Sequence, residues 1–269
     1  MRIGFIGGGN MASALIGGVI NSGLTPPENI IVCDILEQRR TLLQKEFFVQ
    51  VSDSAREVVK SAKTVVLAVK PQNLEGVATE IGGLFTSDQI LISILAGKPR
   101  SAIIAALGQS VRLVRAMPNL PALVGAAITA IAQMPEDIEA QATASSILST
   151  VGKVIVVPED LMDPVTALSG SGPGYVFYLI EAFVQGGVEL GFSAEEALRL
   201  TVETFSGSCK LLLERSAEPS ELRRQVTSPG GTTAAGLSAF DAGGLKGTIA
   251  QGLLAANQRA KELSTPDTK

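Results

Sequence analysis

The chain has 269 residues, of which 46% are hydrophobic and 18% charged, with 28 glycines and no histidine or tryptophan. This length can form two modest domains with cores of their own, and the composition is that of a folded protein. The net charge of −4 excludes the basic surface that nucleic acid requires. Cys33 and Cys209 are too few for a disulfide framework or a cysteine metal site, so we expect no metal and a reducing, cytoplasmic location.

An uncharged stretch over residues 3–27 resembles a signal peptide or a membrane span at first sight. Seven glycines interrupt it, and Asn10 and Asn21 lie inside it. The glycines cluster as a turn between two periodic segments, which a membrane helix would not tolerate so readily. We therefore expect neither a targeting segment nor a membrane partner.

The same stretch predicts a strand, a glycine turn and a helix. Residues 2–6 form a short apolar strand, and a helix is predicted over Asn10–Asn21. The sequence between them reads Gly-x-Gly-x-x-Ala, in which the glycines allow a tight turn and close approach of a pyrophosphate to the helix start. An ordinary strand-to-helix turn is the alternative, but the context favours dinucleotide binding. The expected cofactor contacts are Gly7, Gly8, Gly9, Asn10, Met11 and Ala12.

A second strand, Ile30–Cys33, ends at Asp34, whose carboxylate can accept from the adenosine ribose and favours NAD. Arg39 and Arg40 follow closely and can reach a 2′-phosphate, although two charges on a solvated helix face are an equally good interpretation. The pattern leaves the choice of cofactor open.

Further strands alternate with helices along the first half of the chain. Apolar runs at residues 64–69, 89–94 and 111–116 are typical of buried parallel strands, and the pattern continues through residues 122–131 and 153–157. Because ligands bind at the carboxyl ends of such strands, Lys70 is a candidate for cofactor contact, with an ordinary surface lysine as the alternative. Asn119, in a Pro-Asn-x-Pro step, either serves the nicotinamide or substrate pocket or only shapes a turn.

Strand signals stop after residue 160, and the rest of the chain is predicted to be helical. We place a boundary near residues 158–163, giving a dinucleotide-binding domain over residues 1–160 and a helical domain over 161–269. The helix at residues 175–180 is apolar on every side, so it has to be buried all round. A helical domain of this size can hardly bury it alone, which indicates a second subunit.

A short polar step at residues 228–233 reads Ser-Pro-Gly-Gly-Thr-Thr and lies between two helical segments. Helix starts leave unpaired amides and carry partial positive charge, so a carboxylate or phosphate is stabilised there. An ordinary helix cap is the alternative. Because the N-terminal turn already accounts for the pyrophosphate, a small carboxylate is the better candidate.

These motifs together resemble the pyrroline-5-carboxylate reductase family over essentially the whole chain. The matching segments are residues 3–12, Ala68-Val69-Lys70-Pro71, residues 115–119, residues 169–175 and residues 226–233. The resemblance implies an α/β fold, with an N-terminal Rossmann-like dinucleotide-binding domain and a C-terminal all-helical dimerisation domain. It also implies reduction of 1-pyrroline-5-carboxylate to L-proline, the last step of proline biosynthesis, by a homodimer that some members assemble into a larger ring such as a decamer.

The resemblance also assigns roles to individual residues. Ala68, Val69, Lys70, Pro71 and Asn119 join the cofactor contacts, and NADPH is the favoured donor, while Asp34 leaves NADH open. Ser228, Gly230, Gly231 and Thr232 would bind the substrate carboxylate, and Thr233 would lie close to the ring nitrogen as the catalytic residue.

The absence of histidine excludes a histidine acid–base mechanism. A cyclic imine can arrive protonated and accept hydride directly, so the protein needs mainly to orient the reactants. The closer rival is an imine reductase or hydroxy-acid dehydrogenase that uses Lys210 or Lys246 as its acid–base group. A nucleotide-sensing protein without turnover is a rival of another class, and it would leave residues 228–233 unexplained.

Overall fold

The computed structural model describes residues 1–264 and divides into two compact units. The first unit comprises Met1–Ser171 together with the segment that begins at Ala256, and the second is Gly172–Ala255. The second unit is therefore an insertion, because the chain leaves the first unit and later returns to it.

Within the described residues, a single sheet of eight strands forms the centre of the first unit, in the order β3-β2-β1-β4-β5-β6-β7-β8. The first six strands are parallel, β7 pairs antiparallel with β6, and β8 pairs parallel with β7. The chain order reverses between β1 and β4, so a topological switch point lies at their carboxyl ends. The strands are β1 (Ile3–Ile6), β2 (Ile30–Cys33), β3 (Gln50–Ser52), β4 (Thr64–Leu67), β5 (Ile90–Ser93), β6 (Arg112–Met117), β7 (Ala127–Ala132) and β8 (Gly152–Val157).

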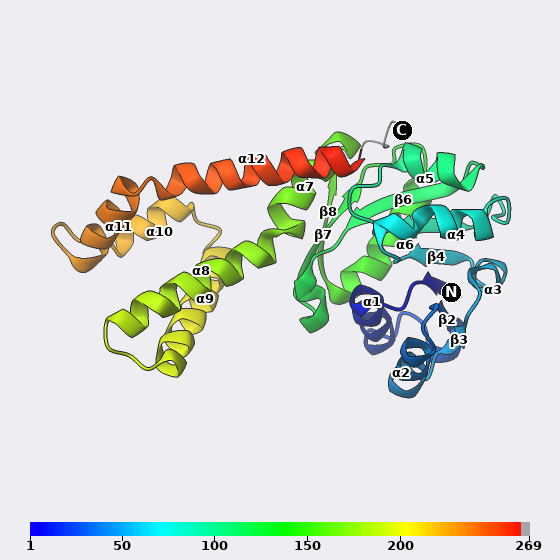
Figure 1. Cartoon of the computed structure of the whole chain (residues 1–269), viewed down its shortest axis with the longest axis horizontal. Coiled ribbons are helices and arrows are strands. Elements are labelled where there is room, and N and C mark those ends of the chain that lie inside the picture. Colours follow the sequence, from blue (N-terminus) through cyan, green and yellow to red (C-terminus); the bar gives the residue numbers. More distant parts are fainter. Residues whose placement is uncertain (265–269) are drawn as a thin grey trace. The chain divides into compact units, whose positions relative to one another are not determined.

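Helices cover both faces of this sheet (Figure 1). Successive strand residues point to opposite faces, so Phe5 enters one core and Ile6 the other. Burial on both sides explains why β1, β2, β4 and β5 read as continuous apolar runs. One face carries α1 (Asn10–Asn21), α2 (Glu37–Phe47) and α6 (Ile138–Leu148), and the other carries α3 (Ala55–Ser61), α4 (Leu74–Ile81) and α5 (Arg100–Leu107).

The structure confirms the predicted α/β fold and most strand positions, with shifts of one or two residues at their ends. The strand pattern expected from residue 122 is partly wrong. Leu120–Val124 forms a 3-10 turn instead, because Pro121 has no backbone N–H and Gly125 takes a φ of +69°. Strand β7 begins only at Ala127.

The second unit consists of helices, as predicted for this part of the chain, and α12 carries the chain back to the first unit. A capping box between Ser193 and Glu196 begins α9, and Phe183 of α8 meets Phe205 of α9 edge to face at 5.2 Å. The helices are α8 (Gly172–Glu189), α9 (Ala194–Arg215), α10 (Pro219–Gln225), α11 (Thr232–Ala242) and α12 (Leu245–Ser264).

This unit buries little of its own apolar surface. Ala197 and Thr201 are its buried residues in the described part of the chain, whereas Tyr178 is 72% exposed and Leu213 79% exposed. Large apolar patches of this kind mark interaction sites. The helix that the sequence predicts to be buried all round is therefore uncovered within one chain.

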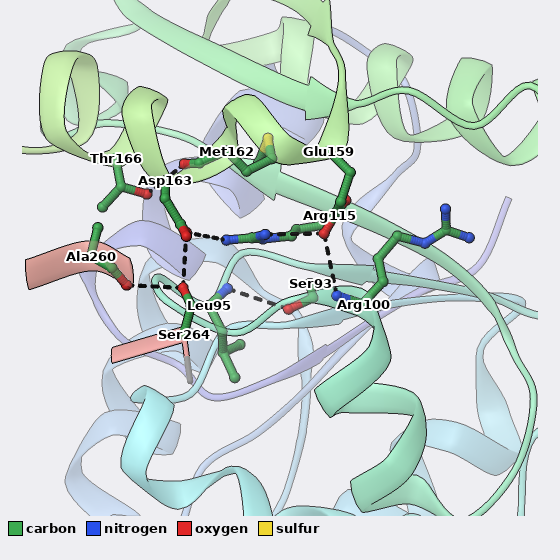
Figure 2. A network of polar contacts seen from close by, with 10 residues as sticks. All are labelled: Ser93, Leu95, Arg100, Arg115, Glu159, Met162, Asp163, Thr166, Ala260 and Ser264. Atoms are coloured by element: carbon green, nitrogen blue, oxygen red, sulfur yellow. Dashed lines mark hydrogen bonds and ion pairs between the residues drawn. The ribbon is translucent and has the colours of Figure 1, made fainter. Parts of the chain in front are cut away.

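A buried arginine connects the end of α12 to the sheet of the first unit (Figure 2). Arg115 of β6 donates to Glu159 Oε1 at 3.0 Å and to Asp163 Oδ1 at 3.2 Å. The Ser264 hydroxyl donates to the same Asp163 oxygen at 2.8 Å. Glu159 and Asp163 belong to the short helices Glu159–Leu161 and Met162–Val165, through which the chain leaves the sheet. A segment that precedes the inserted unit in sequence and the end of α12, which follows it, thus meet at one polar cluster of the first unit.

Across residues 1–264, none of the helices combines the length and the apolar character that crossing a membrane would require.

Candidate functional site

The turn after β1 has a shape that only glycine adopts easily. Gly7 has a φ of +98°, and its amide donates to the Cys33 carbonyl at 2.8 Å. A Cβ placed on Gly7 would lie 2.8 Å from the Ala68 carbonyl oxygen, so the turn after β1 touches the end of β4. The bond from the Ala68 amide to the Ile6 carbonyl, 2.8 Å long, holds these two strand ends together.

The start of α1 is open toward this sheet edge. Gly9 is the N-cap, in an extended conformation, and α1 lacks a side-chain cap among the described residues. A Cβ on Gly9 would meet no described atom within 4 Å, whereas Ala12 is fully buried against the sheet. The free amides and the helix dipole fit a pyrophosphate, and the missing Cβ leaves room for it. The turn thus fits the dinucleotide that its sequence predicts.

Asp34 follows β2 and faces the glycine turn. Its Oδ2 accepts from the Gly8 amide at 2.8 Å, and its Oδ1 accepts from the Leu36 amide at 2.9 Å. Two main-chain donors therefore fix the carboxylate beside the turn. Cys33 precedes it, and burial raises the pKa of that thiol to about 12, so the cysteine stays a protonated core residue.

The structure brings Arg39 to the glycine turn, a contact that the sequence pattern did not predict. Its Nε donates to the Gly8 carbonyl at 2.9 Å, and its Nη2 donates to the same oxygen and, at 3.1 Å, to the Ser13 hydroxyl. Arg40 instead donates from Nη1 to the main-chain carbonyl of Asp34 at 2.7 Å. Arg39 thus binds a main-chain oxygen of the turn after β1, and Arg40 binds one at the end of β2.

The segment after β4 lies beside Gly7 at the same sheet edge. Pro71 begins the 3-10 turn Pro71–Asn73, and the Asn73 amide donates to the Lys70 carbonyl at 2.9 Å. Lys70 itself is exposed. The cofactor contacts predicted from the glycine turn, from Asp34 and from residues 68–71 therefore lie together at the carboxyl ends of β1, β2 and β4.

Asn119 follows β6, separated from β4 by one strand, and is buried. Its Oδ1 accepts from the Ile128 amide at 3.1 Å, and its Nδ2 donates to the Ser169 carbonyl at 3.2 Å. Ser169 belongs to a π-helical turn, Thr166–Gly170, just before α8. The amide of Asn119 thus joins the start of β7 to the turn through which the chain leaves the first unit.

The polar step at residues 228–233 forms a second open helix start, in the second unit. The Gly231 amide donates to the Ser228 carbonyl at 3.1 Å, and Gly230 has a φ of +69°, as in a type II turn with Pro229 before it. Gly231 is the N-cap of α11, which lacks a side-chain cap among the described residues. A Cβ on Gly231 would lie 2.4 Å from the Ser228 hydroxyl oxygen, so this hydroxyl lies at the helix start.

The lysines that a rival mechanism would need lie in surface ion pairs. Lys210 is 3.9 Å from Glu214, and Lys246 is 2.9 Å from Asp241, with all four side chains well exposed. Both lysines thus lie on exposed helix surfaces, each beside an acidic side chain.

Comparisons with known proteins match both parts of the chain. A family model described as pyrroline-5-carboxylate reductase dimerisation matches residues 159–263, and one described as NADP oxidoreductase coenzyme F420-dependent matches residues 2–97. The chain is 41% identical to a pyrroline-5-carboxylate reductase from Methanosarcina acetivorans, and the match covers 97% of each chain.

Two solved structures resemble the whole chain. A pyrroline-5-carboxylate reductase from Coxiella burnetii matches with a TM-score of 0.91 and 37% identity, over 98% of each chain. A pyrroline carboxylate reductase from Plasmodium falciparum with NADP bound matches with a TM-score of 0.88 and 28% identity, again over 98% of each chain.

Proposed function

Because the chain belongs to the pyrroline-5-carboxylate reductase family, we propose that it reduces 1-pyrroline-5-carboxylate to L-proline with a reduced nicotinamide dinucleotide. In a cell this is the last step of proline biosynthesis, and we expect it in the cytoplasm. The observation that carries the proposal is the presence of two glycine-capped helix starts, at Gly9 and Gly231. A nucleotide-binding protein without turnover would need only the first.

The first unit supplies the cofactor site in this proposal. Residues 7–12 hold the pyrophosphate, Asp34 faces the adenosine ribose, and residues 68–71 with Asn119 line the path toward the nicotinamide. When bound, the cofactor supplies hydride. The protein contributes orientation, since hydrogen bonds from the Gly7 and Ala68 amides fix the turn after β1.

The second unit supplies the carboxylate site. Ser228, Gly230, Gly231 and Thr232 surround the start of α11, where a hydroxyl, main-chain amides and the helix dipole favour an anion. Thr233, one residue further, would bond to the ring nitrogen as donor or acceptor. A protonated imine needs no proton from the enzyme before hydride transfer, which suits a chain without histidine.

The proposed division of labour follows the predicted domains, with cofactor binding in residues 1–160 and substrate binding and dimerisation in 161–269. The exposed apolar side chains of α8, α9, α11 and α12 support a homodimer formed through the helical unit. A larger ring such as a decamer would consist of such dimers. Sedimentation of the full chain should therefore show a dimer or a multiple of it, and a monomer at micromolar concentration would contradict this.

Turnover tests the activity directly. Purified protein is mixed with NADH or NADPH and pyrroline-5-carboxylate, and the nicotinamide absorbance is followed, with a panel of 2-hydroxy acids and NAD or NADP as the comparison. We expect loss of the reduced cofactor with pyrroline-5-carboxylate alone. If neither donor is oxidised with this imine, the proposed activity is wrong, and turnover of a hydroxy acid would favour a dehydrogenase instead.

A further inference from the structure

The turn between β2 and α2 carries the groups that decide which adenosine ribose the first unit accepts. We propose that this turn selects NADH over NADPH, with Asp34 as the specificity-determining residue and Arg39 as a positioning residue for the glycine turn. The inference rests on the proposed function, in which a nicotinamide dinucleotide binds at residues 7–12. It concerns the end of the cofactor that carries or lacks a 2′-phosphate.

Asp34 is held in place for a ribose that has free hydroxyls. The amides of Gly8 and Leu36 each bond to a different oxygen of its carboxylate, at 2.8 and 2.9 Å. A carboxylate has about four acceptor positions, so each oxygen keeps capacity for a ribose hydroxyl. A 2′-phosphate offers acceptors and negative charge to the same oxygens, which would repel it.

Arg39 is bound to the glycine turn and is not directed at a phosphate. It donates from two nitrogens to the Gly8 carbonyl and from one of them to the Ser13 hydroxyl at 3.1 Å. The Gly8 residue is thus held at its amide by Asp34 and at its carbonyl by Arg39. This brace fixes the turn for the pyrophosphate, a group that NADH and NADPH share.

The remaining side chains of the turn offer little to a phosphate. Ile35 is 85% exposed and Leu36 60% exposed, so two apolar side chains follow Asp34 at the rim of the site. Glu37 adds a second acid at the start of α2. Arg40 is the other arginine near the turn, and its Nη1 is shared between the carbonyls of Asp34 and Ile35, at 2.7 and 3.3 Å.

Calorimetric titration of the full chain with NADH and with NADPH measures the selection without turnover. We expect NADH to bind at least about tenfold more tightly, equal to about 1.4 kcal/mol. The ratio of kcat/KM for the two donors, with pyrroline-5-carboxylate as substrate, should favour NADH by a similar factor. Tighter binding of NADPH to the wild-type chain would overturn the proposal.

Variants separate the charge of Asp34 from its hydrogen bonds. Asp34→Asn keeps one acceptor oxygen and removes the charge, whereas Asp34→Ser shortens the side chain, and both should reduce the preference for NADH by at least about tenfold. Arg39→Gln should lower the affinity for NADH and for NADPH by similar factors. Thermal unfolding of each variant identifies any that no longer fold, and the asparagine variant, which is nearly isosteric, then decides.

Arg40→Gln is the matched control. If Arg40 bound a 2′-phosphate, its replacement would weaken the binding of NADPH and leave the binding of NADH unchanged. A decrease of tenfold or more in the affinity for NADPH alone, in this variant or in Arg39→Gln, would refute the proposal. We expect the NADH to NADPH ratio of Arg40→Gln to stay within about twofold of wild type. Failure of the proposed function would give a different result. If the chain binds NADH more tightly than NADPH but does not oxidise it with pyrroline-5-carboxylate, the proposed activity is wrong and the proposed cofactor preference still holds.

Discussion

The substitution Gly9→Ala should separate cofactor binding from stability at the first helix start. Gly9 has a φ of −69° and a ψ of −179°, which alanine adopts without strain, and a Cβ there meets no described atom within 4 Å. Alanine is a poorer N-cap than glycine, and this cost offsets the gain from the reduced freedom of the unfolded chain, so the free energy of unfolding should stay within about 1 kcal/mol of wild type.

The same methyl group would stand where a pyrophosphate approaches the amides of α1. Losing one charge-assisted hydrogen bond costs roughly 1.5–3 kcal/mol, so the Kd for NADH should rise roughly 10- to 150-fold. Titration calorimetry measures the affinity, and urea unfolding without cofactor measures the stability. An unchanged Kd for Gly9→Ala would show that the pyrophosphate does not approach this glycine.

Gly7→Ala provides the contrast. Its φ of +98° costs an alanine about 1–3 kcal/mol. Its Cβ would also lie 2.8 Å from the Ala68 carbonyl oxygen, which is main chain at the end of β4 and cannot rotate away. This variant should lose at least about 2 kcal/mol of unfolding free energy, whereas Gly9→Ala should not. Equal stability of the two variants would refute the reasoning from backbone geometry.

Three further substitutions test other parts of the chain. Thr233→Ala should lower kcat/KM for pyrroline-5-carboxylate about tenfold and leave the Kd for NADH unchanged, and wild-type kinetics would remove its assigned role. The ion pair with Arg112 lowers the pKa of Asp137 from 3.8 to about 2, so its stabilisation is present above about pH 4 and is lost as the pH falls toward 2. Urea unfolding of Asp137→Asn should accordingly show a deficit of about 1–2 kcal/mol at pH 7 that shrinks steeply between about pH 4 and pH 2. Arg115→Met leaves Asp163 without its buried cation and should cost about 3 kcal/mol in the same measurement.

Local sequence was sufficient for the elements that build the first helix start. Asn10–Asn21 and Ile30–Cys33 have the bounds that their apolar patterns predict. β2 is fully buried and α1 buries one apolar face, and both lie next to glycine or polar residues, so the change in pattern is abrupt at each end. Gln50–Ser52 gave no such signal, because a three-residue strand at the sheet edge needs no continuous apolar run.

The contacts around Gly8 could not be predicted in the same way. Arg39 lies 31 positions further along the chain, and its neighbour Arg40 has the same chemistry. Which of the two reaches the glycine turn depends on the pairing of β1 with β2 and on the rotation of α2, neither of which is visible in a list of charges. Arg115 is a similar case, since an arginine in an apolar strand gives no indication that Asp163 and Ser264 meet it.

The two proposed anion sites share a design that sets them apart from the capped helices. Asp137 caps α6 and Ser193 caps α9, so side-chain oxygens already bond to the first amides of these helices. The N-caps of α1 and α11 are Gly9 and Gly231, which have no side chain to place there. Each helix start also follows a turn that contains a glycine with positive φ, which directs the chain sharply into the helix. An external anion can therefore reach amides that a serine or an aspartate would otherwise occupy, at Gly9 in the unit proposed for the cofactor and at Gly231 in the unit proposed for the substrate carboxylate.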